Sequence, residues 1–168
     1  MEKKFFTTQE LVFTALMTAL VFVATYLPHI PIPLGYAHLG DAVIFLLAFL
    51  APRRTTLFAA CIGSALADLL GGFALWIVPT LVIKFVMAEI VCRIGRRGNE
   101  IAPRSGIIAA LFLASLWMAA AYTLAGAVLY ASLPAALASA PGLLMESAVN
   151  SIITFLLLPV LRERFPSF

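Results

Sequence analysis

The chain consists of long apolar runs separated by short polar breaks, and this pattern limits it to few kinds of fold. Of its 168 residues, 63% are hydrophobic and only 11% are charged. A soluble domain carries about 25% charged residues. A run of about 20 apolar residues can cross the hydrocarbon core of a bilayer as a helix. The sequence therefore predicts an integral membrane protein without a separate soluble domain.

Glycines, prolines and arginines divide the chain into six candidate spans. The breaks fall at Pro52-Arg53-Arg54, at Gly71-Gly72, in the run RIGRRGNE and in the run YASLPAALASAPG. The second span is the weakest because it is short. The predicted fold is an all-α membrane protein, a compact bundle of six transmembrane helices that forms one domain over residues 1–168. Its spans are expected at roughly 9–27, 41–52, 55–71, 74–93, 105–130 and 142–161.

The basic residues indicate which way the bundle faces. Every Lys and Arg except Lys84 falls at the N-terminus, at the C-terminus or in the second or fourth connection. Cytoplasmic connections of membrane proteins carry this excess of positive charge. We therefore expect cytoplasmic N- and C-termini, and we interpret the net charge of +3 as a topology signal rather than a sign of nucleic-acid binding.

A few polar residues interrupt the spans, and most of them fall in the outer half of the membrane. Charged residues inside a span are costly and call for a specific role. At a rise of about 1.5 Å per residue, the inner half is almost entirely apolar. Glu89 is the inner exception, placed to pair with Arg93 one turn away. The outer group is Asp41, Asp68, Lys84, Glu146 and Asn150, with Tyr36, His38, Trp76, Tyr122 and Tyr130 near its mouth.

This outer group predicts a cavity that opens outward and suits a small, polar, ring-containing ligand. Glu146 and Asn150 are four residues apart on one helix face and have no evident local partner, which favours ligand binding. For the others, two interpretations stay open. Asp41 is either a helix N-cap or a ligand contact. Asp68 and Lys84 form either an ion pair with each other or contacts to the ligand.

The first outer connection, PHIPIPLGYAHLGD at residues 28–41, is predicted to be a lid over this cavity. Its prolines restrict the loop and lower the cost of closing it. Gly35 and Gly40 are expected to form turns. His38 is the expected ligand contact, although a solvated loop histidine is an equal alternative. His29 and His38 with Asp41 lack the ligand spacing of a metal site, so neither a metal nor a cofactor is expected.

The first span carries small residues four apart, Ala15 and Ala19, in its inner half. Such a face allows close approach of another helix, either within the bundle or from a separate membrane protein. The chain has no G-x-x-x-x-G-K-[ST] loop and therefore cannot use ATP alone. It also lacks the hydrolase and metalloprotease motifs, so it is not expected to be an enzyme.

Several runs resemble a known family. They are GYAHLGDAVIFL (35–46), GSALADLLGG (63–72) followed by WIVPTLVIK (76–84), and Ala15-x-x-x-Ala19. Together with the six spans, they resemble the substrate-binding S components of energy-coupling factor (ECF) vitamin transporters, in the riboflavin/hydroxymethylpyrimidine-type subgroup. The resemblance covers the whole chain.

The resemblance implies a high-affinity binder of a vitamin or vitamin precursor in a prokaryotic plasma membrane. It implies partners too: a membrane coupling subunit and two cytoplasmic ATPases. It favours His38, Trp76, Lys84, Glu146 and Asn150 as substrate contacts, and Ala15 and Ala19 as the docking face. Donor and acceptor matching favours a hydroxymethylpyrimidine- or pyridoxine-like ring over riboflavin.

Two other functions remain open. One is a stand-alone ion- or proton-coupled carrier with Asp68, Lys84 and Glu146 as a relay. The other is a structural membrane subunit without a ligand.

Overall fold

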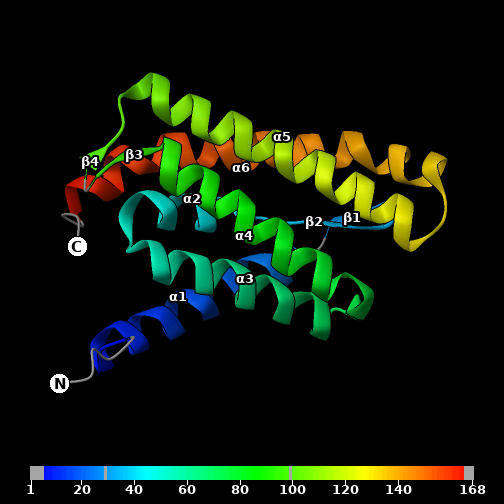
Figure 1. Cartoon of the computed structure of the whole chain (residues 1–168), viewed down its shortest axis with the longest axis horizontal. Coiled ribbons are helices and arrows are strands. Elements are labelled where there is room, and N and C mark those ends of the chain that lie inside the picture. The colour runs from blue at the N-terminus through cyan, green and yellow to red at the C-terminus, as the bar shows by residue number, and fades with distance from the viewer. Residues whose placement is uncertain (1–5, 29, 99, 165–168) are drawn as a thin grey trace.

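Each of the six apolar runs folds as a helix in the computed structural model, which describes residues 6–28, 30–98 and 100–164 (Figure 1). Two short antiparallel hairpins connect some of them: β1 (Ile30–Ile32) with β2 (Gly35–Ala37), and β3 (Arg96–Arg97) with β4 (Glu100–Ile101). The helices are α1 (Thr8–Tyr26), α2 (Gly40–Leu50), α3 (Arg53–Leu70), α4 (Ile77–Ile94), α5 (Arg104–Leu129) and α6 (Leu133–Arg164), with a 3-10 turn at Ala74–Trp76 before α4. His29, Lys3 and Lys4 lie outside the described residues.

Four helices in the described chain are long and apolar enough to cross a membrane: α1, α4 with its preceding turn, α5 and α6. The predicted all-α membrane protein is therefore confirmed in its main character. α2 has 11 residues and is about 16 Å long, about half of a bilayer core. α3 has 18 residues but includes Arg53, Arg54 and Asp68. The count of six spans stays a prediction.

The start of the sixth helix was predicted wrongly. α6 begins at Leu133, about nine residues before the expected start at 142, and the whole run LPAALASAPG is helical. Pro134 lies in the first turn, where its missing N–H is not needed. Ser132 stabilises this end through the backbone N–H groups of Ala135 and Ala136. Pro141 lies inside the helix, which membrane helices tolerate when neighbours satisfy the freed backbone.

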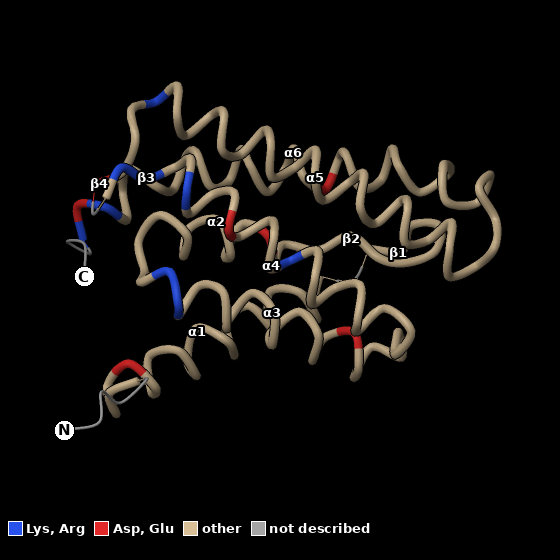
Figure 2. The backbone as a smooth tube through the Cα atoms, viewed as in Figure 1, with Lys and Arg blue, Asp and Glu red and all other residues tan. Residues whose placement is uncertain are grey.

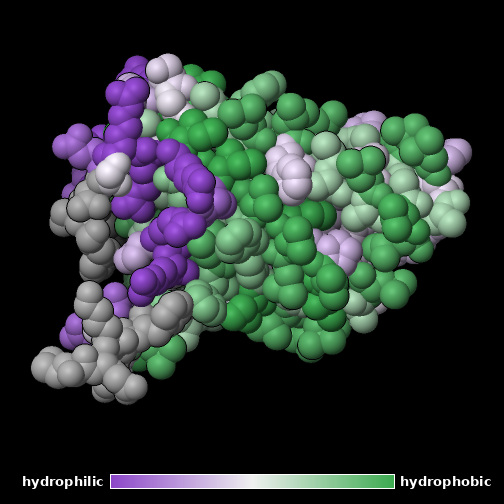
Figure 3. Space-filling model, viewed as in Figure 1, coloured by the Kyte–Doolittle hydropathy of each residue, from purple (hydrophilic) through white to green (hydrophobic). Residues whose placement is uncertain are grey.

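Charge separates the two ends of the bundle. α1 begins and α6 ends at the same end, beside the β3–β4 hairpin and the α2–α3 turn (Figure 1). Most of the Lys and Arg residues gather at this end in Figure 2. Lys84 lies within α4, seven residues after the helix begins. The surface of the rest of the molecule is mostly hydrophobic in Figure 3. This distribution is the one that the charge count in the sequence predicts.

α1 packs closely on α3, and a glycine makes this possible. A Cβ atom on Gly63 would lie 2.8 Å from the carbonyl oxygen of Thr18 and 2.9 Å from the Val21 side chain. Thr14 completes the contact by a hydrogen bond of 3.0 Å to Thr55. Ala15 and Ala19 are exposed, so they do not take part in this packing.

The apolar core lies between the helices on the side of the cavity nearer the charged end. It is formed mainly by α2, α4 and α5, with large buried side chains from Phe45, Phe49, Met87, Val91 and Met118. Cys92 is part of this core and Cys61 is half-buried, and both are free thiols. The core gives the cavity a closed apolar floor.

The predicted lid is a β-hairpin rather than an irregular loop. Its strands pair Ile30 with Ala37 and Ile32 with Gly35. The left-handed residue of the turn is Leu34, with φ of 63°, whereas we expected Gly35 to serve this purpose. A positive φ is rare for a bulky residue and signals a local constraint. The contacts of the hairpin, described below, supply that constraint.

Candidate ligand-binding cavity

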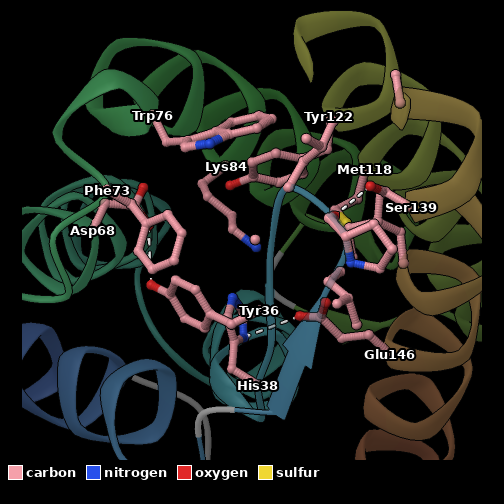
Figure 4. A pocket seen from close by; sticks show the side chains of 16 residues that line it. Tyr36, His38, Asp68, Phe73, Trp76, Lys84, Met118, Tyr122, Ser139 and Glu146 are labelled. Carbon is pink, nitrogen blue, oxygen red and sulfur yellow. Dashed lines mark hydrogen bonds and ion pairs between the residues drawn. The ribbon is translucent and has the colours of Figure 1, made fainter. Parts of the chain in front are cut away.

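A small cavity lies beneath the β1–β2 hairpin, between α3, α4, α5 and α6 (Figure 4). Its volume is about 60 Å³, which is room for a few water molecules. Tyr36 and His38 line it from the hairpin segment, Trp76 and Tyr122 form an aromatic wall, and Met118 and Leu143 supply apolar surface. The remaining polar lining is Asp68, Lys84, Ser139 and Glu146.

The hairpin is held over the cavity by contacts to two helices. The Ser139 hydroxyl of α6 donates a hydrogen bond to the carbonyl oxygen of Pro33. A Cβ atom on Gly142 would lie 2.8 Å from the Ile32 side chain, and one on Gly126 would lie 3.3 Å from the Leu34 side chain. Because these two glycines have no side chain, the hairpin packs closely against α6 at Gly142 and against α5 at Gly126. The contact at Gly126 holds the side chain of Leu34, the residue with the positive φ.

Tyr36 connects the hairpin to α3. Its hydroxyl donates a hydrogen bond of 3.0 Å to Oδ1 of Asp68. Burial, reinforced by the charge of Asp68, raises the pKa of the Tyr36 phenol, so the phenol keeps its proton and remains the donor. Oδ2 of Asp68 accepts a hydrogen bond of 2.5 Å from Thr80, whose oxygen in turn accepts one of 3.1 Å from Tyr122. Asp68 therefore organises one side of the cavity.

Lys84 is almost completely buried, and its ammonium group forms an ion pair with Asp41 of α2. Its Nζ also lies 5.3 Å from the centre of the Tyr122 ring, within the range of a cation–π contact. The predicted alternative of an ion pair between Lys84 and Asp68 was wrong. Lys84 pairs with Oδ1 of Asp41, whereas Asp68 accepts its hydrogen bonds from Tyr36 and Thr80.

His38 and Glu146 connect the end of the hairpin segment to α6. Nδ1 of His38 lies 3.1 Å from Oε1 of Glu146 and accepts a hydrogen bond of 3.2 Å from the backbone N–H of Gly40. Nδ1 can donate to Glu146 only when it carries a proton, and it can accept from Gly40 only when it does not. The two contacts therefore compete for Nδ1, and a proton on this nitrogen favours the contact to Glu146.

Asn150 and Asp41 lie behind the cavity rather than on its lining. Oδ1 of Asn150 accepts the backbone N–H of Ala42 at 3.0 Å, and its amide donates to the carbonyl oxygens of His38 and Glu146, both at 2.9 Å. Asn150 therefore joins the start of α2 to α6. Asp41 is not the N-cap that one interpretation proposed: the N-cap position is Leu39, and Asp41 lies in the first turn.

Five of the seven candidate contacts line this one cavity, namely His38, Asp68, Trp76, Lys84 and Glu146, and their role in substrate binding stays a prediction. It missed Ser139 and Gly142, because both lie in the run that we interpreted as a connection. It also missed Gly126, whose importance depends on which side chains face it. The indole N–H of Trp76 donates to the hydroxyl of Tyr130 at 3.2 Å, which fixes the aromatic wall.

The cavity holds more negative than positive groups. Asp68 and Glu146 line it together with Lys84, whose charge is already paired with Asp41 behind the cavity, and His38 is a further cation only when it is protonated. Oδ2 of Asp41 is buried and accepts no hydrogen bond from the described residues, and the contact of Oε1 of Glu146 to His38 is a hydrogen bond only when Nδ1 of His38 carries a proton. Among those residues, no group of three His, Cys, Asp or Glu side chains could hold a metal ion. The lining therefore suits a ligand with hydrogen-bond donors.

A family model described as ECF-type riboflavin transporter, S component, matches residues 5–163. The chain belongs to this family. An S component is the substrate-binding part of a transporter, and it is not an enzyme. This membership confirms the resemblance found in the sequence.

One curated relative of this S component comes from Pyrococcus woesei and is described as an uncharacterized protein in a gap 3′ region. The two sequences are 45% identical over 73 residues, which is 42% of this chain and 49% of the relative. The chain thus spans about half the length of the curated relative it matches.

Proposed function

We propose that the chain is the high-affinity substrate-binding component of an ECF importer for a water-soluble vitamin or vitamin precursor. The observation that carries this proposal is the cavity itself: a polar, aromatic-walled chamber under a hairpin, at a distance from the charged end of the bundle. With the arginines on the cytoplasmic side, the cavity faces the outside and both termini face the cytoplasm.

The size of the cavity favours a single-ring substrate. A volume of about 60 Å³ is small for a ligand pocket, which typically has about 300–1,000 Å³. A hydroxymethylpyrimidine- or pyridoxine-like ring needs less expansion than the three fused rings of riboflavin. Glu146 and Asp68 are suited to amino and hydroxyl donors of such a ring, and Trp76 and Tyr122 to its faces.

Binding experiments on the purified protein in detergent test this proposal. Thermal unfolding is measured with hydroxymethylpyrimidine, pyridoxine and riboflavin, together with mass spectrometry of co-purifying small molecules. A ligand present at about 100 times its Kd stabilises the folded protein by about 2.7 kcal/mol. We expect submicromolar binding of one single-ring compound, weakened by Glu146→Gln. Folded protein that no vitamin stabilises would contradict the proposal.

Transport itself is proposed to depend on a membrane coupling subunit and two cytoplasmic ATPases, since the sequence has no nucleotide-binding loop. The exposed Ala15 and Ala19 on α1, the least buried of the four long apolar helices, are the proposed docking face. Trp at either position is expected to preserve binding and abolish uptake. Normal uptake by these variants would exclude the docking role.

A proton-coupled carrier that works alone is the competing function, with Asp68, Lys84 and Glu146 as its relay. The core next to the cavity includes Phe45, Phe49, Met87 and Val91, and apolar side chains of this kind cannot relay a proton. We therefore expect liposomes that contain the chain alone to show no gradient-driven uptake. Such uptake would favour the carrier.

A further inference from the structure

The seam between α5 and α6 contains two hollows that lie outside the ligand cavity. The first, here called the basic groove, has a volume of about 770 Å³ and lies where α5 begins and α6 ends. The second, here called the apolar groove, has a volume of about 430 Å³ and lies further along the seam. The basic groove includes Arg104, Ile107, Phe155, Leu158, Arg162 and Glu163. The apolar groove includes Phe112, Ser115, Leu116, Ser151, Ile152 and Phe155.

The two grooves adjoin at Phe155, which lines both. The register of the helices shows how they align. α5 and α6 run antiparallel (Figure 1), and the hydroxyl groups of Ser115 and Ser151 are hydrogen-bonded at 3.1 Å. Arg104 precedes Ser115 by 11 residues, and Arg162 follows Ser151 by 11. Both arginines therefore lie at the same level, about 16 Å from the serine pair.

This length matches one leaflet of a bilayer. The hydrocarbon core is about 30 Å thick, so half of it is about 15 Å. With the arginines at the membrane surface, the apolar groove reaches the middle of the bilayer. Nine of its twelve lining residues are hydrophobic and three are serines, and its outer residues Phe112, Leu116 and Ile152 are exposed.

The charge of the basic groove favours an anion. Arg104 and Arg162 are exposed, and neither forms an ion pair with any carboxylate of the described residues. Glu163 is the one acidic residue of the lining. Arg104 is also the first residue of α5, which has 26 residues and an N-cap, Pro103, without a side-chain hydrogen bond. The positive end of the α5 dipole therefore adds to the two arginines.

We propose that this seam is a binding site for one anionic phospholipid of the cytoplasmic leaflet. The phosphate of the headgroup lies between Arg104 and Arg162 at the start of α5, and an acyl chain lies in the apolar groove. A free phosphate would use the arginines and leave the apolar groove empty. A partner helix would fill the apolar groove but would leave the arginines without anionic groups.

Native mass spectrometry tests this proposal on the full chain released from nanodiscs that contain equal amounts of phosphatidylglycerol and phosphatidylcholine with the same acyl chains. We expect one retained phosphatidylglycerol in preference to phosphatidylcholine. Each arginine near the surface contributes about a fivefold gain in affinity, so R104Q/R162Q should weaken phosphatidylglycerol binding about 30-fold. The control R54Q/R97Q removes the same charge from the same end of the bundle outside the groove, and it should change binding less than about threefold.

A second variant separates the lipid from other occupants. Ala148→Phe fills the apolar groove, and it should weaken binding of long-chain phosphatidylglycerol but spare a dihexanoyl form. Equal retention of both lipids, or equal losses in the two arginine double variants, would overturn the proposal. So would competition by soluble glycerol phosphate at the same concentration as the lipid, because that result identifies a free-phosphate site.

Discussion

At the cavity end of the bundle, Lys84, Asp41 and Glu146 are each less than a tenth exposed, and each has a charged or ionisable neighbour on a different segment. At the end that holds the termini, the side chains of Arg53 and Arg93 are 53% and 73% exposed, and both bind Glu89. The first group lies where a charge without a partner is costly, and the second lies where water and lipid headgroups solvate charge. Similar ion pairs should therefore contribute very differently to stability.

Removal of Lys84 should have the largest effect. Lys84→Ala leaves Asp41 buried without its partner, which should destabilise the protein by about 3–5 kcal/mol. Thermal and chemical unfolding in detergent measures this loss. D41N/K84M removes both charges and should recover a large part of the stability. If Lys84→Ala has the same free energy of unfolding as the unmodified protein, the buried ion pair contributes no more to stability than the exposed ones.

Tyr36→Phe removes one hydrogen bond between the hairpin and α3 and keeps the ring. Because the lost bond is to a carboxylate, we expect a loss of about 1.5–3 kcal/mol, reduced to the extent that Thr80 compensates. Hydrogen exchange of residues 30–37 should become faster, since the hairpin loses this attachment. The control is Tyr130→Phe, whose hydroxyl accepts from Trp76 at an exposed position. Equal protection of the hairpin in both variants would show that Tyr36 does not hold it.

Gly142→Ala tests the close packing of the hairpin against α6. The new methyl group meets the Ile32 side chain at 2.8 Å, and the cost of overpacking exceeds the gain in helix propensity, for a net loss of about 1 kcal/mol. Hydrogen exchange of β1 is the measurement. Gly35→Ala is the matched control in the same hairpin, because a Cβ atom there meets nothing within 4 Å. If Gly35→Ala accelerates hydrogen exchange of β1 as much as Gly142→Ala does, the close packing at Gly142 does not hold the hairpin.

Arg93→Gln should have the smallest effect. It removes an exposed pair to Glu89 between residues four apart on α4, and Arg53 still binds the carboxylate. We expect a loss of about 0.3–0.5 kcal/mol that high salt removes. Unfolding at low and at high ionic strength measures it. A loss as large as that of Lys84→Ala would remove the distinction between the two ends.

The sequence predicted what depends on position along one helix, and it failed where the direction of a side chain decides. Apolar runs located the helices, and the arginines identified one end of the bundle. The pair of Glu89 with Arg93 followed from their spacing, and it was confirmed at 2.5 Å. The choice between Asp41 and Asp68 as the partner of Lys84 depends on how three helices are rotated, which spacing does not encode.

The start of α6 was missed for a different reason. Prolines usually end helices, so Pro134 and Pro141 indicated a connection between two helices. Membrane helices keep such prolines when a neighbouring segment packs against them. Here the hairpin covers this part of α6, through Ser139 and Gly142. A contact between segments more than 100 residues apart thus supports this proline-containing part of the helix, and local sequence cannot show that contact.

The shortness of α2 has a consequence for how this architecture can diversify. α2 reaches only about 16 Å, which is about half of the thickness of a bilayer core, and the β1–β2 hairpin precedes it in the chain. Residues 30–42 thereby supply the cover of the cavity, the histidine beside Glu146 and the partner of Lys84. These thirteen consecutive residues contact α3, α4, α5 and α6, so a change in them alters the cover of the cavity and the charges beside it together. A new substrate preference could then arise from a change in one short stretch of the gene.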